Sequence, residues 1–478
     1  MATWHLAQGT DHSRRAGGPS TPGGRRGWRP ALKIGVLGGG PLGLAAAYRL
    51  SQNGHEVVIL ERDTVVGGLA SAFQVGGTWL EKFYHHIFRT DTVIASLIDE
   101  VGLKPRLYWG RPKTSNLVGG VPYQLDSPLS VLKFTPLPFA DRVRLGVGAA
   151  YLKFLRDYRR LEDITAAEWI RRWMGERVYE VVWKPMLQSK FGAYYDQIAM
   201  PWFWSRVHLR TASLGYLHGG FHQLFVRLSD RIRDMGGKLA LGEEVQRIAS
   251  QPDGQVTVTA TSRDGQHELA FDSVVVALPT RLFTKMAPEL PEDYRARYDW
   301  GDHYGAHSVV IALDRQLLTD NTYWLSVTDP GYPFLAAVEH TNFIDSSHYG
   351  GLRLLYLGNY LPMSDERFRK SGDGVVASYL PHLAKLNPAF DESWVKETFT
   401  FKAPFAQPIV TKEFRRHIPP LWTPIRNVFL ANMFQVYPQD RGQNYSIRLG
   451  EEVARLAMRV GSWPDPATAE KWAGLAGS

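Results

Sequence analysis

The residues most clearly suited to chemistry are Gly38, Gly40 and Gly43, which form the pattern G-x-G-x-x-G. The first allows a tight turn, the second lets a pyrophosphate approach the backbone, and the third lets a helix pack against a strand. Glu61 follows Gly43 by 18 residues, a position from which it would accept hydrogen bonds from ribose hydroxyls and disfavour a 2′-phosphate. The pattern therefore predicts a dinucleotide site; the alternative is a buried unit in which the glycines serve packing alone.

The elements around these glycines are those that such a site requires. "LKIGVLGGG" predicts a strand that ends in the glycines, and "PLGLAAAYRLSQNG" predicts a helix that stops at Gly54. "HEVVILE" predicts a second buried strand, with Val57 to Leu60 at its centre. The phosphates would then lie at the helix N-terminus, where free N–H groups and the helix dipole favour an anion.

The segment after Glu61 points to FAD in particular. It reads "RDTVVGGLASAF", which gives the pattern E-x5-G-G with Gly67 and Gly68. This extended pattern resembles the FAD fingerprint of the flavin amine oxidase superfamily, which includes amine oxidases, protoporphyrinogen oxidase and phytoene desaturases, with UDP-galactopyranose mutase as a relative. The resemblance implies that FAD contacts Gly38, Gly40, Pro41, Leu42, Gly43, Glu61, Arg62, Gly67, Gly68 and Leu69.

A second segment near the C-terminus extends this resemblance. "NVFLANMFQVYPQDRGQNYSIRLGEEVARLA" predicts a strand, a loop and a helix that begins near Asn444, as in the C-terminal FAD segment of the superfamily. Relatives usually have Gly-Asp or Gly-Glu where this chain has Asn432-Met433, although Asn432 would still be able to bond a phosphate or ribityl oxygen. The implied cofactor contacts in this part of the chain and at the adenine are Val245, Asn432, Met433, Asn444, Tyr445 and Ser446.

The predicted fold is α/β, with a Rossmann-like (GR2-type) FAD-binding domain interleaved with an α+β substrate-binding domain. No second G-x-G-x-x-G is present, so the sequence predicts no additional NAD(P)H site. The expected divisions are a disordered tail over 1–30, an FAD-binding domain over 31–100, 212–282 and 416–461, a substrate-binding domain over 101–211 and 283–415, and a C-terminal tail over 462–478.

The first candidates for catalysis are His85 and His86, within "GGTWLEKFYHHIFRTD". Relatives commonly carry a histidine in the segment near the flavin, and on a strand the two side chains would point to opposite faces. The alternative is that each is a core histidine bonded to a backbone carbonyl. The chain has no cysteine, which excludes thiolate chemistry, and no clear metal motif, so we expect no metal site.

Three further segments carry residue types that suit a ligand. Trp183, Lys184, Lys190, Phe191, Trp202, Trp204 and Arg206 suit an apolar substrate with an anionic group, or a seam between packed helices. The tetrad Glu339, His340, Thr341 and Asn342 would line a site at a strand end. Residues 128–160 carry seven basic and two acidic residues, and Val143, Val147, Ala150, Tyr151, Phe154 and Tyr158 recur at helical spacing. This segment is either a helix on an anionic membrane or a domain helix whose apolar face lies in the core.

Charge and hydropathy limit the kinds of partner and the cellular locations that the sequence predicts. Residues 1–33 contain six basic residues and one acidic residue, so they account for most of the net charge of +8. The rest of the chain therefore has no large basic surface, and no nucleic-acid surface is predicted. The sequence has no window of 18 uncharged apolar residues, so it predicts no membrane-spanning helix. A twin-arginine export signal is a weaker explanation of the N-terminal segment than a tail followed by the predicted strand and helix. The expected location is the cytoplasm, with peripheral contact at the inner face of the membrane as the alternative.

The predicted function is an FAD-dependent oxidoreductase that removes a hydride from a bulky, largely apolar small-molecule substrate. An amine, a porphyrinogen-like molecule or a polyene-like molecule would fit that description. Two alternatives use the same scaffold. One is a non-redox flavin mutase or isomerase that resembles UDP-galactopyranose mutase. The other is a non-catalytic binding protein, as in the Rab GDP-dissociation inhibitors.

Overall fold

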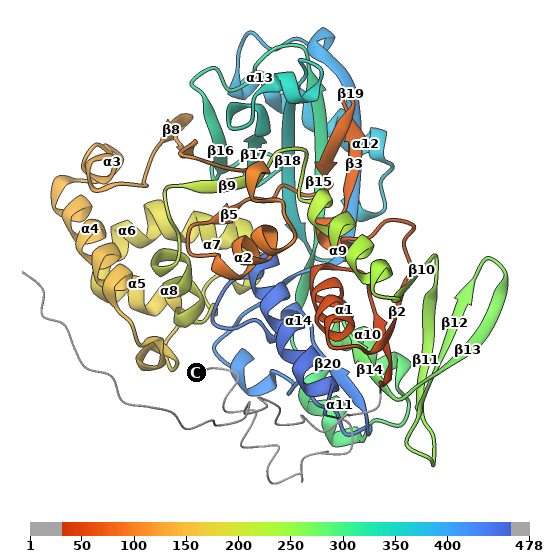
Figure 1. Ribbon diagram of the computed structural model, residues 1–478. Coiled ribbons are helices and arrows are strands. Elements are labelled where there is room, and N and C mark those ends of the chain that lie inside the picture. The colour runs from red at the N-terminus through yellow and green to blue at the C-terminus, as the bar shows by residue number, and fades with distance from the viewer. Residues whose placement is uncertain (1–30, 460–478) are drawn as a thin grey trace, which may run out of the picture. The chain divides into compact units, whose positions relative to one another are not determined.

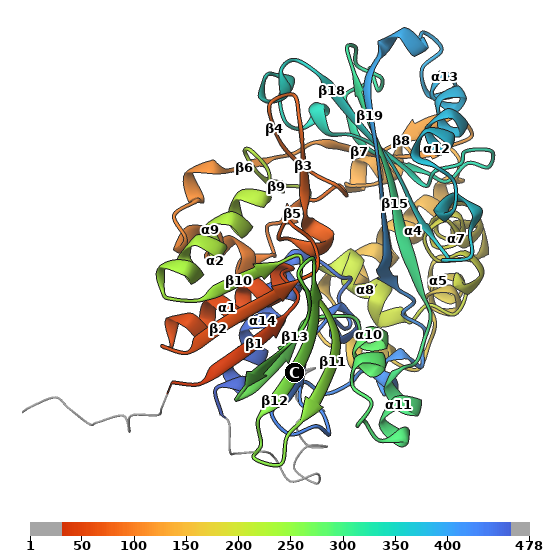
Figure 2. The same cartoon turned by 90° about the vertical axis from the view of Figure 1, so that its right-hand side faces the viewer.

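The computed structural model describes residues 31–459, and both predicted tails, 1–30 and 462–478, lie outside the described residues. A five-stranded sheet in the order β10-β2-β1-β14-β20 holds the glycine motif (Figure 2). All its neighbouring strands pair in parallel, so their carboxyl ends meet along one edge. The strands are β1 (Lys33–Leu37), β2 (Glu56–Glu61), β10 (Lys238–Leu241), β14 (Ser273–Val276) and β20 (Val428–Leu430).

Three helices pack together at this sheet: α1 (Pro41–Gln52), α9 (His222–Asp234) and α14 (Gln443–Ala457). β1 and β2 are rich in β-branched residues and are buried almost throughout, as expected of parallel strands covered on both faces. α1 and α14 lie side by side (Figure 1). Their close approach depends on Gly450, where a Cβ atom would be only 2.3 Å from the Leu42 carbonyl oxygen.

An antiparallel three-stranded sheet follows β10 and leads back into the parallel sheet. Its strands β12 and β13 form a tight hairpin in which Ser262 pairs with Gly265. β14 ends at Val276, and the Ala277 N–H donates to the Leu37 carbonyl beyond its end. The elements of this part are β11 (Glu244–Ser250), β12 (Val256–Ser262), β13 (Gly265–Phe271), α10 (Thr280–Met286) and α11 (Glu292–Tyr298).

A seven-stranded sheet, in the order β19-β15-β18-β17-β16-β7-β8, joins strands from two distant parts of the chain. β7 pairs with β16 in parallel, and this pairing links residues 113–118 to residues 322–327. Helices α12 (Gly372–Tyr379) and α13 (Leu383–Leu386) lie in the same half of the molecule (Figure 1). The strands are β7 (Lys113–Val118), β8 (Val121–Tyr123), β15 (His303–Leu313), β16 (Thr322–Val327), β17 (Ala336–Glu339), β18 (Arg353–Leu361) and β19 (Val395–Pro408).

Two smaller sheets combine strands from the segment after the glycine motif with β9, which follows the helical region. They comprise β3 (Ala72–Val75) with β4 (Thr78–Glu81), and β5 (Ile87–Phe88) with β9 (Leu214–Leu217) and β6 (Leu107–Gly110). Helix α2 (Thr92–Glu100) follows β5 and packs against α14. These short elements join the parallel sheet to the rest of the fold.

Residues 128–208 form a helical cluster with its own aromatic core, in which Tyr179, Phe191 and Trp202 are fully buried. Figure 1 shows α3 and α4 on the outer side of this cluster. Among residues 31–459, no helix is long and apolar enough to cross a membrane. The helices are α3 (Pro128–Leu132), α4 (Phe139–Phe154), α5 (Ala166–Met174), α6 (Glu176–Val178), α7 (Lys184–Phe191) and α8 (Met200–His208).

The exposed face of α4 corrects one of the two predictions for residues 128–160. The predicted apolar face does not enter the core: Val143, Val147, Tyr151 and Phe154 are all exposed. The residues of α4 that are buried are Leu145, Gly148 and Leu152. Gly148 fits closely against Met174, so a small residue rather than a large one marks the inward face. The helix therefore has apolar residues on two sides. The helical spacing in the sequence marks the side that faces outward.

Candidate active site

The glycine motif forms a narrow backbone cradle at the carboxyl end of β1. Gly38 adopts a φ of 111°, which favours glycine, and a Cβ atom on Gly43 would lie 1.9 Å from the Gly38 carbonyl oxygen. Gly40 is the N-cap of α1 and offers no capping side chain. The Gly67 N–H donates to the Gly39 carbonyl at 2.9 Å, which brings the Gly67-Gly68 turn against the start of α1.

Glu61 ends β2 beside this cradle. Its Oε2 atom accepts a hydrogen bond from the Gly39 N–H at 2.6 Å, and its Oε1 atom accepts one from the Asp63 N–H at 2.9 Å. A carboxylate has about four acceptor positions, so Glu61 retains capacity for ribose hydroxyls. Arg62 is exposed, Leu69 is half-buried in the short 3₁₀ turn η1 (Gly68–Ala70), and Val245 is buried on β11.

The start of α14 is a second helix N-terminus without a capping side chain. Its N-cap is Gly442, and the helix begins at Gln443, one residue before the predicted start. The Gln443 amide is buried, and neither Oε1 nor Nε2 has a hydrogen-bond partner. Tyr445 and Ser446 are half-buried in the same first turn. Unpaired polar groups of this kind fit an elongated ligand rich in acceptors and donors.

These features are consistent with FAD as the group held here. α1 and α14 pack together, so two helix N-termini with free N–H groups serve one region. The N-terminus of α1 suits the pyrophosphate, and that of α14 suits a carbonyl that gains negative charge. Glu61 suits a ribose, as predicted from the sequence.

Two predicted contacts are already committed to internal hydrogen bonds. Asn432 donates from Nδ2 to the Leu278 carbonyl at 2.9 Å and accepts the Phe434 N–H at 2.9 Å through Oδ1. Asn444 accepts the N–H groups of Val93 and Ile94 at the start of α2. Both side chains therefore fix the loops around the site. The Asn432 N–H and carbonyl are bonded to Gln435 as well, so the contacts of Asn432 and Asn444 with FAD stay predictions.

Met433 is half-buried and begins the 3₁₀ turn η12 (Met433–Gln435) that Asn432 caps. The Gln435 side chain accepts the Asn432 N–H and donates to the Leu430 carbonyl. The two bonds of Gln435 hold this turn against the end of β20. The predicted contact of Met433 with FAD stays a prediction.

His85 and His86 lie just before β5 rather than within a strand, yet they have different partners. His85 bonds through Nδ1 to the Phe83 carbonyl at 2.6 Å, and His86 bonds through Nδ1 to the Tyr323 hydroxyl at 3.2 Å. Burial lowers the pKa of His85 to about 4 and that of His86 to about 3. Both rings are therefore neutral near pH 7. The carbonyl partner of His85 matches the structural alternative considered for it.

A group of charged side chains lies next to these histidines and was not recognised as a unit in the sequence. Lys190 on α7 and Arg206 on α8 both bind the Asp440 carboxylate, with a Lys190 Nζ to Asp440 Oδ2 distance of 3.0 Å. The neighbouring Arg441 donates to the Tyr360 hydroxyl at the end of β18. We call Lys190, Arg206, Asp440, Arg441 and Tyr360 the cation cluster.

The electrostatics of the cation cluster are unusual because it contains three cations and one carboxylate, which two of them bind. The side chains of Lys190, Asp440 and Arg206 are 16%, 20% and 24% exposed. Burial lowers the pKa of Lys190 to about 7, despite the opposing effect of Asp440. Burial raises the pKa of Asp440, but Lys190 and the arginines outweigh it and hold that pKa far below its usual range. The Arg441 Nε atom is buried and has no partner.

The cation cluster joins directly to the predicted FAD site. Asp440 and Arg441 immediately precede Gly442, the N-cap of α14. The charge of Arg441 further lowers the pKa of His85, and Arg210 and Arg206 do the same for His86. A sequence signal for this cluster existed: two charged residues directly before a helix N-terminus, where the dipole disfavours a cation. Their partners, however, come from distant segments.

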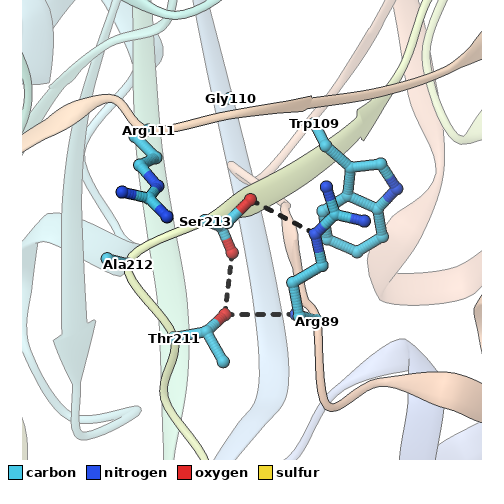
Figure 3. A pocket seen from close by; sticks show the side chains of 7 residues that line it. All are labelled: Arg89, Trp109, Gly110, Arg111, Thr211, Ala212 and Ser213. Carbon is cyan, nitrogen blue, oxygen red and sulfur yellow. Dashed lines mark hydrogen bonds between the residues drawn. The ribbon is translucent and has the colours of Figure 1, made fainter.

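A hollow of about 540 Å³ opens at the segment that leads into β9 (Figure 3). The Arg89 guanidinium lies over the Trp109 ring at 4.0 Å, and its Nε atom is 3.4 Å from Ser213 Oγ. Thr211 accepts the Arg89 N–H through Oγ1 at 3.1 Å. The lining residues are Arg89, Trp109, Gly110, Arg111, Thr211, Ala212 and Ser213.

The polar tetrad at the end of β17 has a structural role in this fold. Glu339 is fully buried and accepts the N–H groups of Leu317 and Leu318. His340 bonds to the Tyr349 hydroxyl at 2.7 Å. Asn342 donates to the carbonyl groups of Leu318 and Thr322. Glu339 and Asn342 thus fix the loop before β16, and His340 fixes the turn that ends at Tyr349. In the described part of the chain, no group of three or more acidic or histidine side chains is arranged to hold a metal ion.

Comparison with known proteins supports the same fold and cofactor. A 15-cis-phytoene desaturase of Narcissus pseudonarcissus is 24% identical over 401 residues, which cover 76% of this chain and 68% of the desaturase. A solved protoporphyrinogen oxidase-like protein of Exiguobacterium sp. 255-15 has a TM-score of 0.70 at 17% identity, over 90% of this chain and 99% of that one. A reduced UDP-galactopyranose mutase has a TM-score of 0.70 at 16% identity, over 94% and 99% of the two chains.

These structural likenesses, at such low identity, establish the fold alone. The family is established by a separate comparison, because the model of the family described as flavin containing amine oxidoreductase matches residues 43–438. That match includes part of the glycine motif, Glu61, the histidine pair and most of the segment before α14. The chain therefore belongs to the flavin containing amine oxidoreductase family and is an FAD-dependent oxidoreductase.

Proposed function

We propose that this oxidoreductase removes a hydride from a bulky, largely apolar substrate that carries one anionic group. The single observation that carries the proposal is the cation cluster, which has three cations and one carboxylate beside the start of α14. When bound, FAD supplies the acceptor for the hydride. The protein's own residues bind the substrate, orient it and keep water out.

The charge balance of the cation cluster favours an anion. Buried cations are stable when they are paired, and two of the three here already share the single carboxylate of Asp440. Arg441 has a buried Nε atom without a partner. A carboxylate or phosphate group would accept from such a guanidinium in a strong, charge-assisted bond. The same group would neutralise the excess positive charge.

The aromatic side chains of the cation cluster favour an apolar body for the substrate. Lys190 Nζ lies 5.2 Å from the centre of the Tyr360 ring, and the Arg441 guanidinium lies 4.9 Å from the same ring. Lys190 also lies 5.4 Å from the Trp202 ring. Aromatic rings beside cations hold an amphipathic molecule by its apolar surface and its charge together.

Lys190 and the two histidines are the groups that would handle protons. With a pKa of about 7, Lys190 is present in both forms at neutral pH and would accept or release a proton at Nζ. His85 and His86 are neutral and would serve as hydrogen-bond partners rather than as charged acids. We therefore propose His85 and His86 as residues that orient the substrate, and Lys190 as the proton carrier.

A second candidate function is a flavin mutase that acts on a sugar nucleotide. The same excess of cations suits a diphosphate, which carries more negative charge than a single carboxylate. The fold likeness to UDP-galactopyranose mutase is consistent with this alternative. The aromatic rings around Lys190 favour the oxidoreductase on an apolar substrate, because a sugar needs more polar partners.

The test compares pairs of substrates that differ in charge. Under anaerobic conditions, an apolar carboxylic acid should bleach the absorbance of the bound flavin faster than its methyl ester. Arg441→Gln should reduce this preference at least about tenfold, the loss expected for the charge-assisted bond from its guanidinium. Arg263→Gln is the matched control, since Arg263 is 94% exposed.

Two results would refute the proposal. One is an equal rate for the acid and the ester in the wild-type enzyme. The other is turnover of a sugar nucleotide only after reduction by dithionite, which would establish the mutase. Flavin content after desalting separates both results from a simple loss of cofactor.

A further inference from the structure

The outer face of α3 and α4 exposes an unusual run of large apolar side chains. Phe139 is 68% exposed, Val147 64% and Phe154 81%. On a helix these residues lie along one side, and α4 would extend that side for about 24 Å. We call the following residues the outer apolar face: Leu129, Leu132, Phe139, Val143, Val147, Tyr151 and Phe154.

Single exposed apolar residues are common, but a continuous stripe of them usually marks a contact surface. The inner side of α4 is already occupied, because Leu145 and Leu152 are buried in the helical cluster. α4 thus packs against the protein with one apolar side and presents another to its surroundings. The second side needs a partner of its own.

The charges around the outer apolar face identify the chemistry of that partner. Lys133, Arg144, Arg156 and Arg160 are exposed along α3, α4 and the turn after α4. Asp141, the acidic residue within α4, is only 14% exposed. Apolar side chains with a basic border favour a surface that is apolar inside and anionic at its rim.

Two other basic residues in this region hold the fold and are not part of that border. Arg142 donates to the Leu137 and Leu132 carbonyls and so fixes the loop between α3 and α4. Lys153 donates to the His208 and Arg210 carbonyls at the end of α8. The outer apolar face is therefore held rigidly on the helical cluster. A preformed surface of this kind loses little entropy when it docks.

We propose that the outer apolar face docks on the surface of an anionic lipid bilayer, with the exposed basic residues at the headgroups. The apolar side chains enter the boundary between headgroups and acyl chains, and the helix lies parallel to the membrane plane. No helix in the described range 31–459 spans a bilayer, so the contact is peripheral. This inference does not depend on the substrate assigned above.

The test uses the full-length, FAD-loaded protein and sedimentation with vesicles. The wild-type protein should sediment with vesicles of phosphatidylcholine and phosphatidylglycerol. Val147→Ser with Phe154→Ser should weaken this binding by at least about tenfold, as expected when two large apolar groups no longer enter the lipid. The matched control is Val226→Ser, because Val226 is a 40% exposed residue on α9, away from this face.

Charge reversal separates the electrostatic part of the binding. Arg144→Glu with Arg156→Glu should reduce binding to the anionic vesicles and change binding to pure phosphatidylcholine vesicles much less. Added salt should have a similar effect, since it screens exposed charges. Flavin content and thermal unfolding of each variant show whether it is folded.

Two results would overturn the proposal. The first is wild-type protein that stays in solution with anionic vesicles, or apolar variants that bind as well as the wild type. The second is a concentration-dependent dimer that Val147→Ser with Phe154→Ser abolishes. That result would assign the outer apolar face to a second copy of this chain.

Discussion

Replacement of Gly43 by alanine should separate the role of the glycine cradle from that of the surrounding fold. The added Cβ atom would lie 1.9 Å from the Gly38 carbonyl oxygen. Non-bonded heavy atoms rest at about 3.5 Å, so the start of α1 must move away from β1 by roughly 1.5 Å. The obstacle is backbone, which cannot rotate aside as a side chain can. We therefore expect a loss of about 3 kcal/mol in the free energy of unfolding, at the upper end of overpacking effects.

The same movement should weaken FAD binding. The N-terminus of α1 would no longer face the Gly67-Gly68 turn, and at least one charge-assisted bond from a backbone N–H should be lost. Such a bond is worth about 1.5–3 kcal/mol, so the dissociation constant should rise by about tenfold to a hundredfold or more. The measurement is flavin absorbance after desalting, together with titration of the apoprotein with FAD.

Gly146→Ala is the matched control for this substitution. Gly146 lies within α4, and a Cβ atom there would have no neighbour within 4 Å. The control should keep its flavin and gain up to about 1 kcal/mol from higher helix propensity. The reasoning is refuted if Gly43→Ala retains flavin and stability at the level of the wild type.

Three further variants test other parts of the structure. Asp440→Asn should destabilise the protein by about 2–3 kcal/mol at pH 7 because it leaves Lys190 and Arg206 unpaired, and urea unfolding should show a smaller difference at pH 9, where Lys190 is neutral and only Arg206 loses a charged partner. Burial lowers the pKa of His340 to about 3, so this group makes stability fall as the pH drops from about 6.5. His340→Gln should reduce the slope of unfolding free energy against pH by up to about 1.4 kcal/mol per pH unit between pH 4 and 6; an unchanged slope would contradict this. Gly450→Ala should lower both stability and flavin content, as its Cβ atom would meet the Leu42 carbonyl oxygen at 2.3 Å; a variant that matches the wild type in both would show that α1 and α14 can separate.

The parts of the fold that follow from local sequence were predicted well. The strand, turn and helix around Gly38 depend on neighbouring residues, and the prediction of FAD is confirmed by the family. The helix predicted to begin near Asn444 begins at Gln443, one residue earlier. In each case, the pattern that specifies the element lies within one short segment.

Features that depend on distant residues were not predicted. Lys190 and Asp440 are 250 positions apart, and nothing in either segment identifies the other as its partner. The orientation of α4 was also open, since a helix with apolar residues on two sides can bury either one. Gly148 determines which side of α4 is buried, because Met174 fills the space beside that glycine. A packing partner from another helix thus fixed the outcome.

The order of strands in the parallel sheet has a consequence for synthesis of the protein. β20 pairs with β14, and α14 packs on α1, so elements from both ends of the described chain complete one layer. The ribosome delivers β1 and α1 first and α14 last. Until residues 428–457 emerge, one edge of β14 and a large apolar side of α1 have no partner. The nascent chain must therefore keep its earliest hydrophobic surfaces protected through almost the whole of translation, and a chain truncated before β20 should aggregate rather than fold.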